Sequence, residues 1–295
     1  MKKKKSNILI VLIFIAGLSL LLYPFISNEW NTYRQSQLLV SYENQVQVLQ
    51  DEGKIDYQNE WERANAYNQA LLPSILPDSF AIAAAAEEPD KEYMACLNLT
   101  GDGMMGYVEI PKIDIKIPIY HTVNDEVLQK AAGHLEGSSL PAGGPSTHAV
   151  LSAHRGLPSA ALFTDLDRLE EGDHFLIQVL DETLCYEVDK INVVEPDDTE
   201  YLQVEDGKDL VTLLTCTPYG VNSHRMLVRG HRVAYVPEEI QKEQAIVNVS
   251  LHTNYLLWVI IGLGITCIFV AALYLKERKA RKSEISINED NHMKE

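Results

Sequence analysis

The chain has 295 residues, with 42 acidic and 25 basic side chains and a formal net charge of −17. This balance argues against a nucleic-acid partner, because surfaces that bind nucleic acid carry an excess of Lys and Arg. The four cysteines are too few for a disulfide framework and lack the spacing of a metal site. We therefore expect no metal and no cofactor, and leave a Cys96–Cys185 bridge open as a minor alternative.

Two apolar runs, 8–26 and 255–275, have clusters of Lys and Arg on their terminal sides. Each is long enough to cross a bilayer, and basic clusters favour the cytoplasmic side. We expect a membrane anchor or signal segment at 1–27, a transmembrane helix at 255–275 and a basic cytoplasmic tail at 276–295. A cleaved signal peptide is the alternative for the first run, but no clear small-residue cleavage site follows it. A buried core helix is the alternative for the second.

Apolar residues at helical spacing predict an N-terminal helical region at 28–73, made of two helices that separate near Gly53. Pro73 ends this region because proline disrupts a helix interior. The next segment, 74–95, is irregular, apolar and long for a loop, which indicates that it rests on a surface. Residues 237–254 form a polar helix or linker.

From 96 to 236 the sequence changes to short apolar runs separated by turn signals. Many short strands at such spacing favour a sandwich or barrel over alternating β–α units. Short helices are predicted at 125–132 and 160–166. The candidate strands are 107–110, 115–120, 148–152, 175–180, 186–194, 211–215 and 226–235.

Cys216 and His154 each follow an apolar strand and enter a loop. If the two strands are neighbours, the side chains meet at one rim of the barrel, where the imidazole can exchange a proton with the thiol. Arg225 stays protonated and can donate hydrogen bonds to a developing oxyanion. This pattern predicts a cysteine nucleophile with a histidine acid/base and an arginine.

Each of these residues also has a simpler interpretation. A single buried cysteine is more often a small core residue than a nucleophile. The histidine partner is not unique in the sequence, and surface ion pairs are the simpler interpretation of Arg155 and Arg229. The histidines that compete with His154 are His148, His224 and His231.

Several motifs together resemble the sortases, the cysteine transpeptidases of Gram-positive cell surfaces. They are Ser152-Ala153-His154-Arg155-Gly156, Thr215-Cys216 after an apolar strand, and Arg225 downstream. Further blocks resemble the class C, or pilin, subgroup, and they begin at Gly101, Ile110, Pro118, Gly133, Ala153 and Cys216. The resemblance implies a mainly β protein with an eight-stranded sortase-type β-barrel at 96–236, short helices and two flanking transmembrane helices.

The resemblance also implies a reaction. Cys216 would cleave a Leu-Pro-X-Thr-Gly sorting signal between Thr and Gly, with His154 as acid/base and Arg225 as the substrate and oxyanion stabiliser. A lysine amine of the next pilin subunit would accept the acyl group at the cell membrane of a Gram-positive bacterium, with the catalytic domain extracellular. The alternatives are a sortase that uses a peptidoglycan amine and a non-catalytic, membrane-anchored surface scaffold.

Class C sortases carry an N-terminal lid with an Asp-Pro-aromatic motif, which here corresponds to Asp78-Ser79-Phe80 within the segment 74–95. By this resemblance, Asp78 pairs with Arg225 and Phe80 covers Cys216. Serine stands in place of proline, whose ring fixes one backbone angle. The open lid should therefore be more flexible, and we expect it to open more readily than an Asp-Pro lid.

Overall fold

The computed structural model describes residues 2–71, 78–80, 89–238 and 240–241, with shorter stretches between 261 and 278. The chain forms two compact units, Met1–Gln244 and Ala245–Glu295, and the described part of the second unit is helical. Among the described residues, no helix has both the length and the apolar character needed to cross a membrane. Several expected segments lie outside the description, namely 72–77, 81–88, most of the linker and the tail beyond 278.

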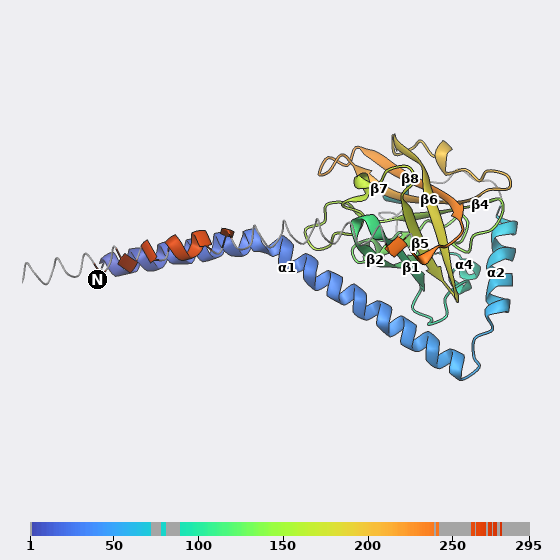
Figure 1. Ribbon diagram of the computed structural model, residues 1–295, viewed down its shortest axis with the longest axis horizontal. Helices are drawn as coiled ribbons and strands as arrows, with labels where there is room; N and C mark the ends of the chain where they lie inside the picture. The colour runs from blue at the N-terminus through green and yellow to red at the C-terminus, as the bar shows by residue number, and fades with distance from the viewer. Residues whose placement is uncertain are drawn as a thin grey trace, which may run out of the picture. The chain divides into compact units, whose positions relative to one another are not determined.

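Two helices cover the described part of the region 28–73, where the spacing of apolar residues predicts them. Helix α1 runs unbroken from Lys2 to Asp51, and α2 spans Tyr57–Ala70 (Figure 1). The side chain of Asp56 caps α2 by accepting a hydrogen bond from the Asn59 amide at 3.1 Å. Leu39 and Tyr42 are the buried side chains of α1 in an apolar cluster with the barrel. The C-terminal half of α1 is therefore part of the catalytic unit.

Eight strands close into a barrel in the order β1-β2-β3-β4-β7-β8-β6-β5, which confirms the expected eight-stranded barrel (Figure 1). Neighbouring strands are antiparallel except for the parallel pairs β2·β3 and β4·β7. The strands are β1 Met104–Ile110, β2 Ile115–His121, β3 Ala132–His134, β4 Thr147–Ser152, β5 His174–Val179, β6 Glu182–Val194, β7 Asp209–Thr217 and β8 His224–Val233.

Short helical elements precede β1 or join the strands. They are α4 Lys91–Ala95, α5 Asp125–Leu128 and the 3₁₀ turns η1 Pro111–Ile113, η2 Leu166–Arg168 and η3 Glu200–Leu202. Alternate side chains of the strands fill the barrel with a continuous apolar core, as small barrels require. This packing fixes the strand ends that carry the candidate site.

The structure corrects two local predictions. The helix expected at 125–132 ends at Leu128, and the chain then forms the three-residue strand β3. At Gly133 of this strand, a Cβ would lie 2.3 Å from the carbonyl oxygen of Thr122, so only glycine permits such close approach. The helix expected at 160–166 is wrong, because Leu162 has a φ of 41°, outside the right-handed helical region.

Candidate active site

Cys216 lies near the end of β7, and Arg225 is its direct partner on the antiparallel strand β8. Directly opposite residues of an antiparallel pair project their side chains on the same face, with Cβ atoms about 5 Å apart. Cys216 is 7% exposed, and the Arg225 side chain is 11% exposed. The guanidinium and the thiol are therefore close neighbours in a site largely shielded from water.

His154 reaches the same rim from β4, which is parallel to β7. The strand ladder ends with Ser152 opposite Leu214. Beyond it, the Ala153 amide donates to the Leu214 carbonyl at 3.2 Å, and the Thr215 hydroxyl donates to the Ala153 carbonyl at 2.8 Å. Because parallel strands end at the same edge, His154 and Cys216 leave the sheet side by side. The structure thus brings the three expected catalytic residues together.

Residues 78–80 lie directly on this rim. The Asp78 carboxylate accepts two hydrogen bonds from Arg225, from Nε to Oδ1 and from Nη2 to Oδ2, both at 2.7 Å. The Phe80 ring lies 5.3 Å from the His154 ring between centroids, and the Arg225 guanidinium lies 5.2 Å from the Phe80 centroid. Two of the three expected catalytic side chains are therefore covered by this short segment.

Ser79 adds a contact that the sequence did not reveal. Its side chain is fully buried, and its Oγ accepts a hydrogen bond from Ser152 Oγ at 2.8 Å. A proline at this position has no hydroxyl to accept such a bond. The serine that departs from the family motif is thus tied to the end of β4, two residues before His154.

Comparisons with known proteins agree with this geometry. Residues 108–233 match the model of the Sortase domain. Sortase A of Bacillus anthracis is 24% identical over 232 residues, which cover 79% of this chain and 96% of that protein. The crystal structure of sortase C from Streptococcus pneumoniae is 42% identical, with a TM-score of 0.59, and the match covers 68% of this chain and 97% of that chain. The chain belongs to the sortase family.

A second structural neighbour is sortase C1 of Streptococcus agalactiae, which is 45% identical with a TM-score of 0.59. This match covers 68% of the present sortase and 100% of the Streptococcus agalactiae chain. Both structural neighbours are class C sortases, and members of the family are cysteine transpeptidases. The present sortase is accordingly a cysteine transpeptidase.

The closed site of this sortase disfavours both charged groups of a thiolate–imidazolium pair. Burial raises the pKa of the Cys216 thiol, Arg225 opposes that shift and Asp78 adds to it. Burial also lowers the pKa of His154, against an opposing effect of Asp125. Desolvation penalises whichever form is charged, so both shifts have the same physical origin. With residues 78–80 in place, the neutral thiol and neutral imidazole are favoured.

The histidines that compete with His154 are occupied elsewhere in the sortase. His148 is the second residue of β4, and its ring contacts the Gln203 carbonyl and the Thr212 hydroxyl. His231 is paired with Leu210 at the far end of β7, and His224 lies 3.2 Å from a Glu195 carboxylate oxygen. The alternative of a disulfide is also resolved, because no disulfide bond joins Cys96 and Cys185.

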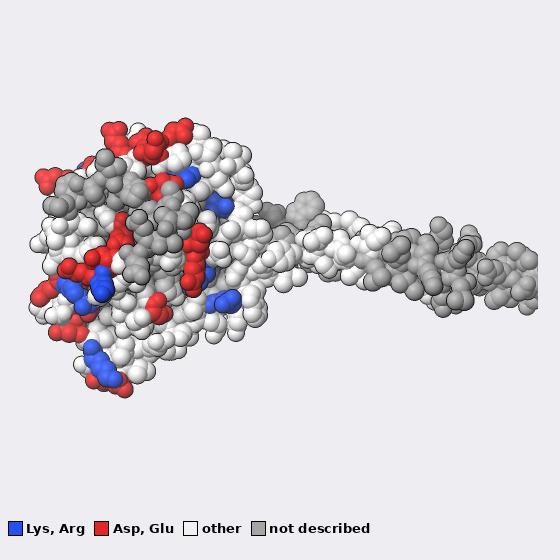
Figure 2. Space-filling model, turned by 180° about the vertical axis from the view of Figure 1, so that it is seen from behind, with Lys and Arg blue, Asp and Glu red and all other residues white. Residues whose placement is uncertain are grey.

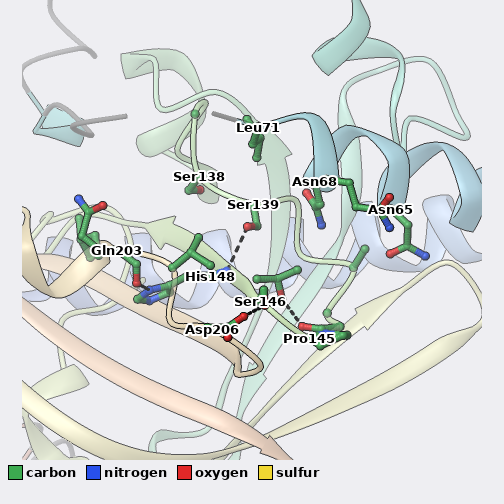
Figure 3. A pocket seen from close by; sticks show the side chains of 18 of the residues that line it. Asn65, Asn68, Leu71, Ser138, Ser139, Pro145, Ser146, His148, Gln203 and Asp206 are labelled. Carbon is green, nitrogen blue, oxygen red and sulfur yellow. Dashed lines mark hydrogen bonds between the residues drawn. The ribbon is translucent and has the colours of Figure 1, made fainter. Parts of the chain in front are cut away.

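A cavity of about 870 Å³, lined by both polar and apolar residues, lies toward the opposite end of β4 and β7 from Cys216 (Figure 3). Asn65 and Asn68 of α2 line one side, while His148 and Asp206 line the other. His148 and Thr212 lie on the same face of β4 and β7 as Ser152 and Cys216, and the length of the two strands separates this cavity from the cysteine. The three expected catalytic residues are not among the described residues that line this cavity.

Proposed function

We propose that this sortase is a membrane-anchored pilin polymerase. It cleaves a Leu-Pro-X-Thr-Gly sorting signal between Thr and Gly and transfers the threonyl acyl group to a lysine amine of another pilin subunit. The observation that carries the proposal is the pair of hydrogen bonds that Arg225 donates to the Asp78 carboxylate beside Cys216. The class C neighbours support it, and the Streptococcus pneumoniae enzyme has been studied for its pilin substrate specificity.

In the proposed reaction, the thiolate of Cys216 attacks the threonine carbonyl carbon. The C–N bond to glycine breaks, and the imidazolium of His154 gives its proton to the departing amine. A lysine amine then attacks the thioacyl carbonyl, His154 takes a proton from that amine, and the thiolate leaves. Arg225 donates to the oxyanion of both tetrahedral intermediates, a role that such donors fill in acyl transfer.

The lid supplies an autoinhibited state in this proposal. Nε and Nη2 of Arg225 donate their hydrogen bonds to the Asp78 carboxylate. In the reaction, the same two groups would have to donate to an oxygen of the substrate. Phe80 lies against the ring of His154, in the space that the leaving amine of the substrate must occupy. Substrate binding therefore requires residues 78–80 to leave the rim. This requirement makes the reaction of the free enzyme with isolated peptides slow.

Membrane anchoring rests on the apolar runs 8–26 and 255–275 and on their basic flanks. With both termini cytoplasmic, the barrel lies outside the cell. Helix α1 includes the first run and continues into the catalytic unit, so an anchor there would be joined to the barrel without a break. Asp and Glu spread across the face of the catalytic unit in Figure 2, which favours the approach of a lysine-bearing acceptor.

An acceptor competition tests the proposal. The full chain carrying Asp78→Ala, in detergent micelles, receives a Leu-Pro-X-Thr-Gly peptide with equal amounts of a pilin-derived lysine peptide and a peptidoglycan stem peptide bearing a free amine. Mass spectrometry then identifies the joined products. We expect the lysine peptide to be joined, and no product with Cys216→Ala.

A product formed only with the stem peptide would show that the enzyme attaches proteins to the cell wall, and it would overturn the pilin assignment. If no product forms and the thiol resists alkylation even in the lid variant, the non-catalytic scaffold is the correct interpretation. Salt in the assay should lower the rate of the lysine reaction if the acidic surface attracts the acceptor.

A further inference from the structure

Arg155 directly follows His154, and its side chain is only 8% exposed. The sequence alone favoured a surface ion pair for this residue. The structure instead places its guanidinium between two segments of the catalytic rim. Nη1 donates to the Thr217 hydroxyl at 3.2 Å, and Nη2 forms an ion pair with the Asp167 carboxylate of η2. One side chain therefore bridges the loop that carries His154 and the strand end that carries Cys216.

This bridge lies where the backbone no longer joins the two strands. Among the described residues, the hydrogen-bonded ladder between β4 and β7 ends at Ala153 and Thr215, one residue before each catalytic side chain. Beyond that point the loops touch through Gly156, where an added Cβ would lie 2.9 Å from the Tyr219 ring. The Arg155–Thr217 hydrogen bond is thus a polar link between the rim loops on the catalytic side of the ladder.

The loop after His154 also returns to η2, which carries Asp167, the second partner of Arg155. The Phe163 amide donates to the His154 carbonyl at 3.1 Å, and the Gly156 amide donates to the Thr164 hydroxyl at 3.0 Å. These bonds return the chain to η2, where Asp167 meets Nη2 of Arg155. The guanidinium therefore closes a ring of contacts around the backbone of His154.

Arg155 is not among the charged residues that shift the pKa values of Cys216 and His154. Arg225 and Asp78 are the charges that shift the pKa of Cys216, and Asp125 is the one that shifts the pKa of His154. Stability is also a weak reason for the presence of Arg155, because buried ion pairs often contribute no more than apolar side chains of similar volume. In addition, Nε of Arg155 is buried without a hydrogen-bond partner, which costs free energy.

We propose that Arg155 is a positioning residue, which sets the distance between His154 and Cys216 by holding Thr217 and Asp167 at once. This inference rests on the proposed roles of Cys216 and His154. Its physical basis is that reacting groups must be held within a fraction of an ångström, and a misplacement of about 1 Å can cost on the order of 100-fold in rate.

The test uses Arg155→Met in the full chain with Asp78→Ala, so that lid opening does not limit the rate. Because Asp167 is 45% exposed, water can solvate its carboxylate once the arginine is removed, and the variant should fold. We expect kcat for thioacyl formation to fall by roughly 10- to 100-fold, with KM within about two-fold and the pH profile unchanged. Thr217→Val should show the same pattern, whereas Thr217→Ser, which keeps the hydroxyl, should restore kcat.

Arg229 provides a matched control. Its side chain is 14% exposed, and it pairs with Asp189 and Glu205 in mid-barrel, opposite Thr212. Arg229→Met should leave kcat unchanged. In the double variant Arg155→Met/Thr217→Val, kcat should fall no further than in the more severely affected single variant. Both substitutions remove the same Arg155–Thr217 hydrogen bond, so their effects should not add.

Three results would overturn the inference: an unchanged kcat in Thr217→Val, an equal loss in Arg229→Met, or losses that multiply in the double variant. Failure of the proposed function would be visible separately, because the Asp78→Ala parent would then form no thioacyl adduct.

Discussion

Asp78 affects the reactivity of Cys216 in two ways. Its carboxylate occupies the Arg225 donors, and its charge adds to the burial that raises the pKa of the thiol. A raised pKa means that the neutral thiol predominates below that value and the reactive thiolate appears only as the pH rises through it. Removing this one negative charge should therefore make the cysteine reactive at lower pH.

We predict that Asp78→Asn shifts the midpoint of Cys216 alkylation by iodoacetamide to lower pH. The rate at neutral pH should also rise, because a lower pKa leaves a larger fraction of the cysteine as thiolate. Mass spectrometry of the modified cysteine after timed reaction at a series of pH values measures the midpoint. Cys216→Ala provides the background from the other three cysteines, Cys96, Cys185 and Cys267. An unchanged midpoint would show that Asp78 exerts no electrostatic effect on the thiol.

Most of the rim could be predicted from local sequence. Cys216, His154 and Arg225 follow or begin apolar strands, and strand ends at one rim bring such residues together. The partners of Ser79 and Arg155 were not predictable in this way. Ser152 is 73 positions from Ser79, and Thr217 is 62 positions from Arg155, so these contacts exist only once the barrel has closed.

At the scale of the lid, Ser79 changes the comparison with an Asp-Pro motif. The sequence predicts a lid that opens more readily because the restriction by proline is lost. The hydrogen bond from Ser152 opposes that effect. A buried hydrogen bond contributes about 1 kcal/mol, which is close to the entropic advantage of a proline. The opening tendency therefore depends on both terms.

We predict that Ser79→Ala opens the lid about three- to ten-fold more often, because the variant loses this bond and leaves the Ser152 hydroxyl unpaired. The alkylation rate of Cys216 with a bulky maleimide measures the opening, and Ser146→Ala, at a site far from the lid, is the control. Ser79→Pro should change the rate less than Ser79→Ala does. Equal rates for wild type and Ser79→Ala would contradict a latch at Ser79.

Element boundaries show where pattern-based prediction stops. Long apolar strands such as β7 were found, whereas the three-residue strand β3 was missed because so few residues give no alternating pattern. The helix expected at 160–166 has helix-forming alanines and leucines. In the structure this loop instead bonds to α1, where Asn28 Oδ1 accepts from the Ala161 amide at 2.8 Å. Tertiary contacts outweigh local propensity here.

For the whole molecule, buried histidines link folding to pH. Burial lowers the pKa of His134 to about 3, and it also lowers the pKa values of His121 and His148. In the unfolded chain these side chains titrate near about 6.5. Below that pH the unfolded state binds more protons than the folded state, so stability is full above pH 6.5 and is lost as the pH falls toward 3.

We predict that the free energy of unfolding of the catalytic unit decreases between about pH 7 and pH 5. Urea titrations followed by tryptophan fluorescence measure this change, with the full chain kept in micelles. His148→Gln should reduce the pH dependence, because it removes one of the buried imidazoles whose pKa is lowered. A constant unfolding free energy across this range would contradict neutral buried histidines.

The barrel was predictable at this scale because its many short strands and its motifs occur together in one stretch. Membrane anchoring stays a prediction from the apolar runs and their basic flanks. Whether the two apolar runs span a membrane depends on their interaction with lipid, and the folded chain alone does not provide that apolar environment. The acidic balance likewise describes the surface of the molecule and not its fold.

The central claim is that Cys216 is the nucleophile and that residues 78–80 limit access to it. Intact-mass spectrometry of the full chain with a Leu-Pro-X-Thr-Gly peptide tests this most directly, with wild type, Asp78→Ala and Cys216→Ala compared side by side. The account predicts a thioacyl adduct on Asp78→Ala, a weaker adduct on wild type and none on Cys216→Ala. An adduct that persists in Cys216→Ala would contradict the nucleophile, and equal adducts on wild type and Asp78→Ala would contradict the lid.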